Sequence, residues 1–381
     1  MLHIGIDGRP LQGKLSGTGK YVYELCRSLD RYLHGASFYV YSQHPVARPV
    51  TSDRWVYRIE SSPLRRTLRS AMWLKSSGGR LSRADNLDVY WGSVSFKPRL
   101  EKGVSFIATV HDFTYLIAPR TMTWTTLTTY RLFFRRDLRG ADFIVANSQA
   151  TADRLRELFH LTTSAVVRPS CSRSYAPVRG EVLDAILARY RISFPYLLII
   201  GTLEPRKNTI TAIEAFLRLK ARGHLPGHRL VVVGQTGWKM GALLSRMAEQ
   251  HADIVFLGYV PDDDLPALYS GSTAFLFPSL YEGFGMPVLE ARACGARVVA
   301  TNLPELIEAA GGRGTFVEPT IEATALGILE ALSSTLSPYT EFESWDDGAR
   351  RLAALLTAAG THYEKQDAAA DSAEAKDEPD L

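Results

Sequence analysis

The stretch from Phe277 to Glu290 constrains the fold of this chain more than any other. The apolar run 273–277 has the pattern of a buried strand and stops at a proline. A loop with two glycines, Gly283 and Gly285, follows, and a helix is expected to begin by Pro287, because proline is tolerated in a first helical turn. This order of elements predicts a backbone that can approach an anion, with the helix N-terminus adding positive partial charge.

Two carboxylates bracket this loop. Glu282 lies on the loop itself, and Glu290 lies two turns into the expected helix. The amides of Gly283, Phe284 and Gly285 can bind phosphate or hydroxyl oxygens, so the whole predicts a site for a phosphorylated, sugar-like ligand. The alternatives are a carboxylate that bonds local amides at Glu282 and a helix-surface ion pair at Glu290.

The string Pro-Ser-x-x-Glu-Gly-Phe-Gly-x-Pro-x-x-Glu-Ala at 278–291, continued by Cys294 and the strand 297–301, resembles the signature of retaining glycosyltransferases of family four. The resemblance implies an α/β GT-B fold. In that fold two Rossmann-like doubly wound parallel-sheet domains face a cleft, and a C-terminal helix crosses back to the first domain. The resemblance also implies that Glu282 meets the donor sugar near the reacting carbon and that Glu290 binds the nucleotide ribose.

A second loop carries two adjacent cations. The buried strand expected at 195–201 leads to Arg206 and Lys207, and a helix is expected to start near Asn208. Arg206 can bind two phosphate oxygens at once while Lys207 supplies a point charge, which suits a diphosphate leaving group. The resemblance places the family's diphosphate-binding arginine and lysine on this loop. The alternative is a solvated helix start.

The first half of the chain offers weaker candidates. His111 follows a strand and resembles the family histidine that faces the donor sugar and lines the acceptor site, although a histidine there can equally be a packed or capping residue. Gly17 and Gly19 come before the first expected helix and can offer amides to the transferring phosphate, or can simply form a tight turn. Arg9 is expected on a cationic rim that faces the acceptor or the phosphate.

Strands and helices alternate along the chain, which predicts parallel doubly wound sheets with ligands at the carboxyl ends of their strands. The expected strands are 2–7, 37–41, 55–59, 88–91, 105–110, 142–146, 165–167, 195–201, 229–233, 254–257, 273–277 and 297–300. The main expected helices begin at residue 20 or cover 123–139, 148–159 and 345–356. We expect an acceptor domain at 1–180, a nucleotide-sugar donor domain at 181–340, a crossover helix at 341–360 and a disordered acidic tail at 361–381.

The charge of the chain is unevenly distributed. The chain of 381 residues carries a net charge of +4, but the tail from 361 holds seven acidic residues and two lysines, which leaves a basic body of +9. A basic body suits anionic ligands such as nucleotide diphosphates or lipid phosphates. The charge is too modest for nucleic acid, and the sequence contains no basic recognition helix, so no nucleic-acid partner is expected.

Three cysteines without paired spacing indicate reduced thiols in a cytoplasmic protein. The N-terminus lacks the pattern of a signal peptide, and no apolar run approaches the ~20 residues that span a bilayer. The acids at 262–264 follow a proline, where acids favour a helix N-terminus. We therefore expect no metal and no cofactor, with the leaving-group charge met by the loop cations and helix dipoles.

Two segments, 64–75 and 130–136, mix cations with large apolar residues. Basic helices of this kind can lie on an anionic bilayer, which would make the protein peripheral at the inner face of the cell membrane. The alternative is a pair of helices packed on a sheet with solvated arginines.

The resemblance implies a hexosyltransferase that keeps the anomeric configuration of a nucleotide diphosphate sugar. The opening 6–11 and the string 109–112 look like those of bacterial mannosyl- and rhamnosyltransferases of O-antigen or exopolysaccharide assembly. GDP-mannose or a derived GDP-deoxyhexose is therefore the first expected donor, and UDP-glucose or a related UDP-sugar the second. A lipid-linked oligosaccharide or growing polysaccharide is the expected acceptor.

Three other classes of protein fit this sequence less well. A nicotinamide dehydrogenase would need Gly-x-Gly-x-x-Gly after the first strand of a half, and neither half has it. An epimerase of nucleotide sugars with the same fold is disfavoured by the pair of glutamates eight residues apart. A non-catalytic nucleotide-sugar sensor is disfavoured because the cations and both glutamates are present together.

Overall fold

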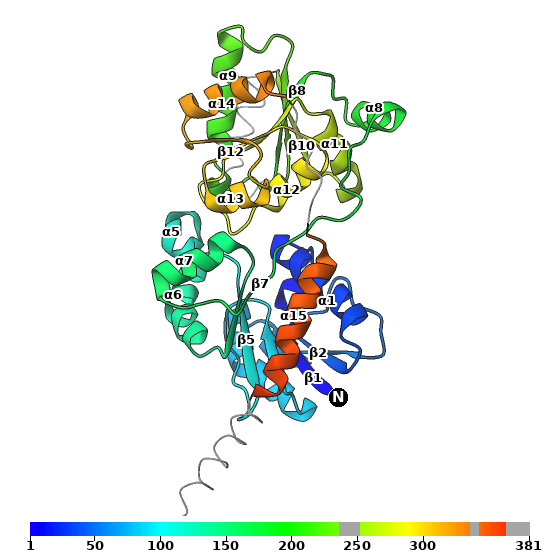
Figure 1. Cartoon of the computed structure of the whole chain (residues 1–381), viewed down its shortest axis with the longest axis vertical. Helices are drawn as coiled ribbons and strands as arrows, with labels where there is room; N and C mark the ends of the chain where they lie inside the picture. The colour runs from blue at the N-terminus through cyan, green and yellow to red at the C-terminus, as the bar shows by residue number, and fades with distance from the viewer. Residues whose placement is uncertain (236–251, 336–342, 363–381) are drawn as a thin grey trace, which may run out of the picture. The chain divides into compact units, whose positions relative to one another are not determined.

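The computed structural model of the chain (Figure 1) describes residues 1–235, 252–335 and 343–362. Contacts divide the chain into two compact units. Unit 1 consists of Met1–His111, Trp124–Pro169 and the described residues from Glu343 onward. Unit 2 consists of Asp112–Thr123 and the described residues of Ser170–Phe342.

Unit 1 is built on a seven-stranded sheet in which every pair of neighbours is parallel. The strands are β1 Leu2–Asp7, β2 Ala36–Ser42, β3 Trp55–Ile59, β4 Val89–Gly92, β5 Ser105–Val110, β6 Phe143–Ala146 and β7 Ala165–Val166. Their order is β3-β2-β1-β4-β5-β6-β7, so the chain moves outward from β1 in both directions. Ligands of such sheets bind where the order reverses, at the carboxyl ends of the strands.

Long helices flank this sheet. They are α1 Gly17–Tyr32, α6 Trp124–Arg139, α7 Gln149–Phe159 and α15 Trp345–Gly360, with shorter turns α2 Pro63–Arg66, α3 Ser70–Trp73 and α4 Gly79–Ser82. Helix α15 lies along α1 in Figure 1. Ser28 and Asp346 join the two helices by a 3.0 Å hydrogen bond. The expected return of the last helix to the first part of the chain is therefore confirmed.

Unit 2 contains a second parallel sheet of six strands in the order β10-β9-β8-β11-β12-β13. The strands are β8 Tyr196–Ile200, β9 Arg229–Val233, β10 Ile254–Gly258, β11 Ala274–Phe277, β12 Val298–Thr301 and β13 Thr315–Val317. The helices are α5 Thr114–Ile117, α8 Gly180–Arg189, α9 Thr209–Ala221, α11 Leu265–Gly271, α12 Met286–Ala293, α13 Pro304–Ala309 and α14 Ile321–Ser333. Successive residues of β8 enter two different apolar clusters, one on each face, as a sheet covered on both sides requires.

The chain passes from unit 1 to unit 2 at residue 170, earlier than the expected boundary at 180. Residues from Ser170 onward belong to unit 2, because Cys171 and Tyr175 pack against its core and Pro177 lies beside Gly295. The expected acidic tail at 361–381 lies almost wholly outside the described residues.

Candidate active site

The loop after β8 holds its two cations in a tight turn. Residues Pro205–Lys207 form a single 3-10 turn, and Asn208 follows in the left-handed region with φ of +51°. Asparagine tolerates this conformation better than most residues, and it allows α9 to begin at once at Thr209. The turn therefore presents Arg206 and Lys207 at the carboxyl end of β8.

Glu282 bridges both cations. Its Oε1 accepts from Lys207 Nζ at 2.6 Å, and its Oε2 lies 2.7 Å from Arg206 Nη1. The carboxylate is only 8% exposed. Burial raises its pKa, but the two cations outweigh that effect and lower the pKa of Glu282 to about 2. Glu282 is therefore ionised at neutral pH, and the alternative of a carboxylate bound only to local amides is wrong.

The two cations are further held by their own neighbours. Arg206 Nη1 donates to the backbone oxygen of Tyr281 at 2.8 Å, and Nη2 donates to Glu204 at 2.9 Å. Burial lowers the pKa of Arg206, but Glu282 and then Glu204 raise it above its ordinary value. The Lys207 ammonium lies 4.7 Å from the centre of the Phe277 ring, a cation–π contact. Phe277 ends β11, so this contact fixes Lys207 over the neighbouring strand.

The loop between β11 and α12 depends on one glycine. Gly285 has φ of +106°, and a Cβ there would lie 2.6 Å from Leu306. The ring of Phe284 is buried in the core of unit 2, so this side chain anchors the loop. These two contacts set the path of Gly283, Phe284 and Gly285 before the helix begins.

Glu290 lies on the inner side of α12. It is 7% exposed and accepts from the hydroxyl of Tyr269 at 3.0 Å. Glu290 therefore does not lie on the exposed surface of the helix, as the alternative of a helix-surface ion pair required.

Tyr281 is a member of the site that the sequence reasoning missed. Its side chain is fully buried, and its hydroxyl accepts from the backbone N–H of Phe113 at 2.9 Å. Phe113 belongs to the short segment Asp112–Thr123 that unit 2 takes from the first half of the chain. The position of Tyr281 directly before Glu282 in the glycine-loop string was the available signal.

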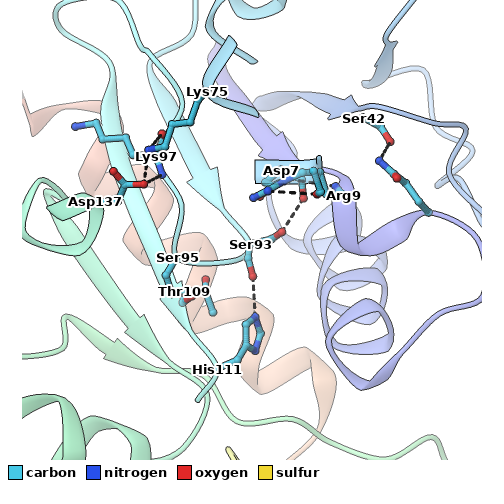
Figure 2. Close-up of polar contacts among 12 residues, drawn as sticks. Asp7, Arg9, Ser42, Lys75, Ser93, Ser95, Lys97, Thr109, His111 and Asp137 are labelled. Atoms are coloured by element: carbon cyan, nitrogen blue, oxygen red, sulfur yellow. Dashed lines mark hydrogen bonds and ion pairs between the residues drawn. The ribbon is translucent and has the colours of Figure 1, made fainter. Parts of the chain in front are cut away.

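His111 ends β5 in unit 1, whereas the glutamates and the paired cations belong to unit 2. Its Nε2 lies 2.7 Å from the backbone oxygen of Ser93 (Figure 2), so that nitrogen carries the proton. The ring packs edge-on against Tyr21, with centroids 5.2 Å apart. Ser93 in turn donates from its hydroxyl to the Asp7 backbone oxygen at 2.6 Å. The histidine is thus held in one tautomer by the end of β4.

The first glycines are placed differently from the expectation. Helix α1 begins at Gly17 and not at Lys20, because Ser16 caps it. The Gly19 amide already donates to the Ser16 hydroxyl at 3.3 Å, and a Cβ at Gly19 would lie 2.5 Å from the backbone oxygen of Pro10. Gly19 is therefore required for close packing.

Arg9 does not form an exposed rim. Its side chain is 7% exposed and pairs with the fully buried Asp7, with Nη2 to Oδ2 at 2.6 Å and Nε to Oδ1 at 2.8 Å. Lys75 and Asp137 make a second ion pair, shown with the first in Figure 2, and Asp137 also lies 3.6 Å from Arg136 Nε. The sequence reasoning missed both acids, although Asp7 stands at the end of a strongly apolar strand.

The acids at 262–264 form a 3-10 turn before α11. Asp264 accepts from Arg189 Nη1 at 2.8 Å and from the Tyr190 hydroxyl at 2.6 Å. Asp264 is the N-cap residue of α11 and makes no capping hydrogen bond with its side chain, which is held by Arg189 and Tyr190.

Two doubly wound parallel sheets, with a last helix that returns to the first unit, define a GT-B fold. The family model described as Glycosyltransferase Family 4 matches residues 15–169, and the model described as Glycosyl transferases group 1 matches residues 191–350. The chain belongs to this glycosyltransferase family and is a hexosyltransferase.

Individual relatives agree with this assignment. The chain is 30% identical over 347 residues to O-antigen chain mannosyltransferase B of Escherichia coli, covering 85% of this chain and 88% of that protein. The sucrose-phosphate synthase structure from Thermosynechococcus elongatus matches with a TM-score of 0.67 and 17% identity over 98% of this chain and all of that one. WaaG, a glycosyltransferase involved in lipopolysaccharide biosynthesis, matches with a TM-score of 0.65 and 15% identity over 95% of this chain and 98% of its own. The two structures support the fold.

Proposed function

We propose that the protein transfers mannose, or a rhamnose-type deoxyhexose, from a nucleotide diphosphate sugar to a lipid-linked or growing polysaccharide chain, with retention of configuration. The cluster of Arg206, Lys207 and Glu282 carries this proposal. Two half-buried cations on adjacent residues can neutralise the charge that develops on a departing diphosphate. Preorganised charges of this kind give the largest single contribution to many enzymatic rates.

Glu282 takes a defined part in this scheme. With its pKa held at about 2, the carboxylate cannot donate a proton at neutral pH. It orients both cations and stabilises positive charge at an oxocarbenium-like anomeric carbon. The bond from that carbon to the leaving phosphate oxygen breaks while the acceptor oxygen bonds on the same face. The acceptor proton passes to the leaving phosphate oxygen, so no second carboxylate is needed.

The remaining candidates fill the same proposal. The amides of Gly283, Phe284 and Gly285 bind sugar hydroxyls or phosphate, and the buried Glu290 binds the ribose. His111 faces the donor sugar and the acceptor. Neither a metal nor a cofactor is required, because Arg206 and Lys207 meet the diphosphate charge.

GDP-mannose is the first proposed donor, because the 30%-identical relative is named a mannosyltransferase and belongs to O-antigen synthesis. UDP-glucose or another UDP-hexose is the second. The test incubates the protein and a lipid-linked oligosaccharide with each donor, with and without EDTA, and reads the product by NMR. An α-linked product from GDP-α-mannose, unchanged by EDTA, is expected. A product of inverted configuration would contradict the mechanism, and turnover of UDP-glucose alone would contradict the donor.

A lipid-linked acceptor brings the enzyme to a bilayer, and unit 1 offers a surface for it. Leu64, Leu68 and Met72 recur every fourth residue and are 78%, 39% and 50% exposed. Trp124 and Leu132 on α6 are 75% and 65% exposed. The same segments also bury Trp73, Leu74 and Phe134, so each has one packed face and one apolar face turned to solvent. We call the five exposed apolar residues and their neighbouring arginines the basic apolar surface.

The charge of this surface suits an anionic bilayer. Exposed arginines stand among its apolar residues, namely Arg66, Arg69, Arg131, Arg135, Arg136 and Arg139. The segment 63–75 contains no acid, and the one acid of α6, Asp137, is buried against Lys75. Basic residues near a charged bilayer each contribute about 1 kcal/mol. Among the residues that the structure describes, no helix is long and apolar enough to cross a membrane.

Vesicle sedimentation tests the membrane part. Phosphatidylglycerol vesicles should bind the protein, neutral phosphatidylcholine vesicles should not, and binding should fall steeply as salt rises. Trp124→Ala with Leu64→Ala should weaken binding about tenfold, because two exposed apolar anchors are lost. The matched control is Leu326→Ala with Val182→Ala, two residues of unit 2 that are 68% and 62% exposed. Equal losses in both pairs would exclude the basic apolar surface as the membrane contact.

A further inference from the structure

A small cavity lies beside Lys207, between the carboxyl ends of the neighbouring strands β8 and β11. Its walls include Gly201, Lys207, Thr209, Phe277 and Ser279. The sheet order reverses between these two strands, which is where parallel sheets bind ligands. Its volume of about 10 Å³ is close to the size that a single water molecule needs. We call it the Lys207 cavity.

Two hydroxyls in the wall of this cavity have no hydrogen-bond partner in the described part of the chain. Ser279 is 0% exposed and Thr209 is 1% exposed. The side-chain nitrogen of the adjoining Asn208 is also buried without a partner. Buried hydroxyls in folded proteins almost always have a partner, in the protein or in ordered water. Two such groups on one cavity therefore indicate that a polar ligand belongs there.

Lys207 forms a third part of the cavity wall, beside Ser279 and Thr209. The end of its aliphatic chain lies over Gly201, where a Cβ would be 3.8 Å from Lys207 Cε. An ammonium has three N–H donors. One of them donates to Glu282 at 2.6 Å, and the ammonium nitrogen lies 4.7 Å from the centre of the Phe277 ring in a cation–π contact. A ligand in the cavity that accepts from this ammonium would complete its surroundings.

We propose that one water molecule in the Lys207 cavity joins Ser279, Thr209 and Lys207. It accepts from the ammonium and from one hydroxyl and donates to the other, the three bonds that a buried water usually makes. Ser279 and Thr209 are thus positioning residues that hold the Lys207 ammonium toward the leaving diphosphate. This inference rests on the proposed function, and it adds two residues that neither the glutamates nor the paired cations include.

Nucleotide binding tests the positioning role. Calorimetry compares GDP and UDP with GMP and UMP for the wild type and for Ser279→Ala, Thr209→Val and Thr209→Ser. Loss of a hydroxyl that holds the water on the Lys207 ammonium should weaken diphosphate binding about tenfold in Ser279→Ala and Thr209→Val. Monophosphate binding should change less than about twofold. Thr209→Ser keeps the hydroxyl and should bind like the wild type.

Each other result has a definite meaning. Equal losses for diphosphate and monophosphate would show that the hydroxyls are merely structural, and unchanged diphosphate binding would overturn the positioning role. A wild type that binds neither GDP nor UDP would defeat the proposed function. In that case a high-resolution crystal structure of the protein still shows whether a water molecule occupies the Lys207 cavity. The inference requires a density peak within hydrogen-bonding distance of both hydroxyls. A cavity without that peak, or one filled by a phosphate oxygen of bound nucleotide, would overturn it.

Discussion

The carboxyl ends of the two sheets carry charge in different arrangements. In unit 1, Arg9 pairs with the fully buried Asp7 at the end of β1. In unit 2, two adjacent cations share Glu282, beside buried hydroxyls that have no hydrogen-bond partner among the described residues. A closed one-to-one pair satisfies itself and stiffens the fold, whereas a shared acid leaves cationic donors for a ligand. The difference teaches that buried charge at the end of a strand is not by itself a sign of a binding site.

The largest effect is expected from breaking a closed pair. Arg9→Ala should lower the free energy of unfolding by about 3–5 kcal/mol, because it leaves the fully buried Asp7 carboxylate without a counter-charge. Urea unfolding measures the change. The double variant Asp7→Leu with Arg9→Met removes both charges and should lose less. A stable Arg9→Ala protein without turnover would show instead that unit 1 uses this arginine for a ligand.

Breaking the shared cluster should act on rate more than on stability. Lys207→Ala should lower kcat/KM about 10²–10³-fold, the usual result of removing one preorganised donor from a developing anion. Glu282 keeps Arg206 as its partner, so the fold should survive. Lys220→Ala serves as the control, since Lys220 pairs with Asp253 elsewhere in unit 2. Loss of folding in Lys207→Ala would place this cluster in the same class as the pairs of unit 1.

The fall in the free energy of unfolding at acidic pH tests the same comparison. Because the folded-state pKa of Glu282 is about 2, below its ordinary 4.5, its ionised form stabilises the fold above pH 4.5 and this contribution is lost as the pH falls toward 2. Urea titrations between pH 5 and pH 3 should therefore show a smaller loss for Glu282→Gln, by on the order of 2 kcal/mol. Identical slopes for both proteins would mean that the two cations do not hold Glu282 in its ionised form.

The smallest effects concern glycine. A Cβ would meet a neighbour at 2.5 Å at Gly19 in unit 1 and at 2.6 Å at Gly285 in unit 2. Gly285→Ala adds strain from a positive φ and should lower the free energy of unfolding by about 1–3 kcal/mol. It should also weaken donor binding. Gly19→Ala should cost stability without altering nucleotide affinity. Gly13, with φ of +57° and open space around it, isolates the backbone strain when changed to alanine. Thermal melts with and without nucleotide measure all three.

Much of the fold is predictable because its signals are local. The apolar runs gave the strands of both units to within a residue or two, and Pro287 marked the start of α12. Strand β13 was not expected, since Thr315–Val317 has three residues and only one of them is buried. The start of α1 was placed too late, because a serine cap at Ser16 outweighs the glycines that follow it.

The site divides in the same way. Arg206, Lys207, Glu282 and Glu290 stand out in the sequence because two loops with fixed residue types follow apolar strands. That Glu282 contacts both cations depends on β8 and β11 lying side by side, although 75 residues separate Lys207 from Glu282. Packing in three dimensions determines the ion pair of Arg9 with Asp7, the hydrogen bond between Phe113 and Tyr281, and the cavity beside Ser279. Periodicity and turn chemistry act between near neighbours, so the sequence alone determined the elements and the candidate residues. Which charged residues form ion pairs depends on which strands become neighbours, and only the tertiary structure decides which strands do.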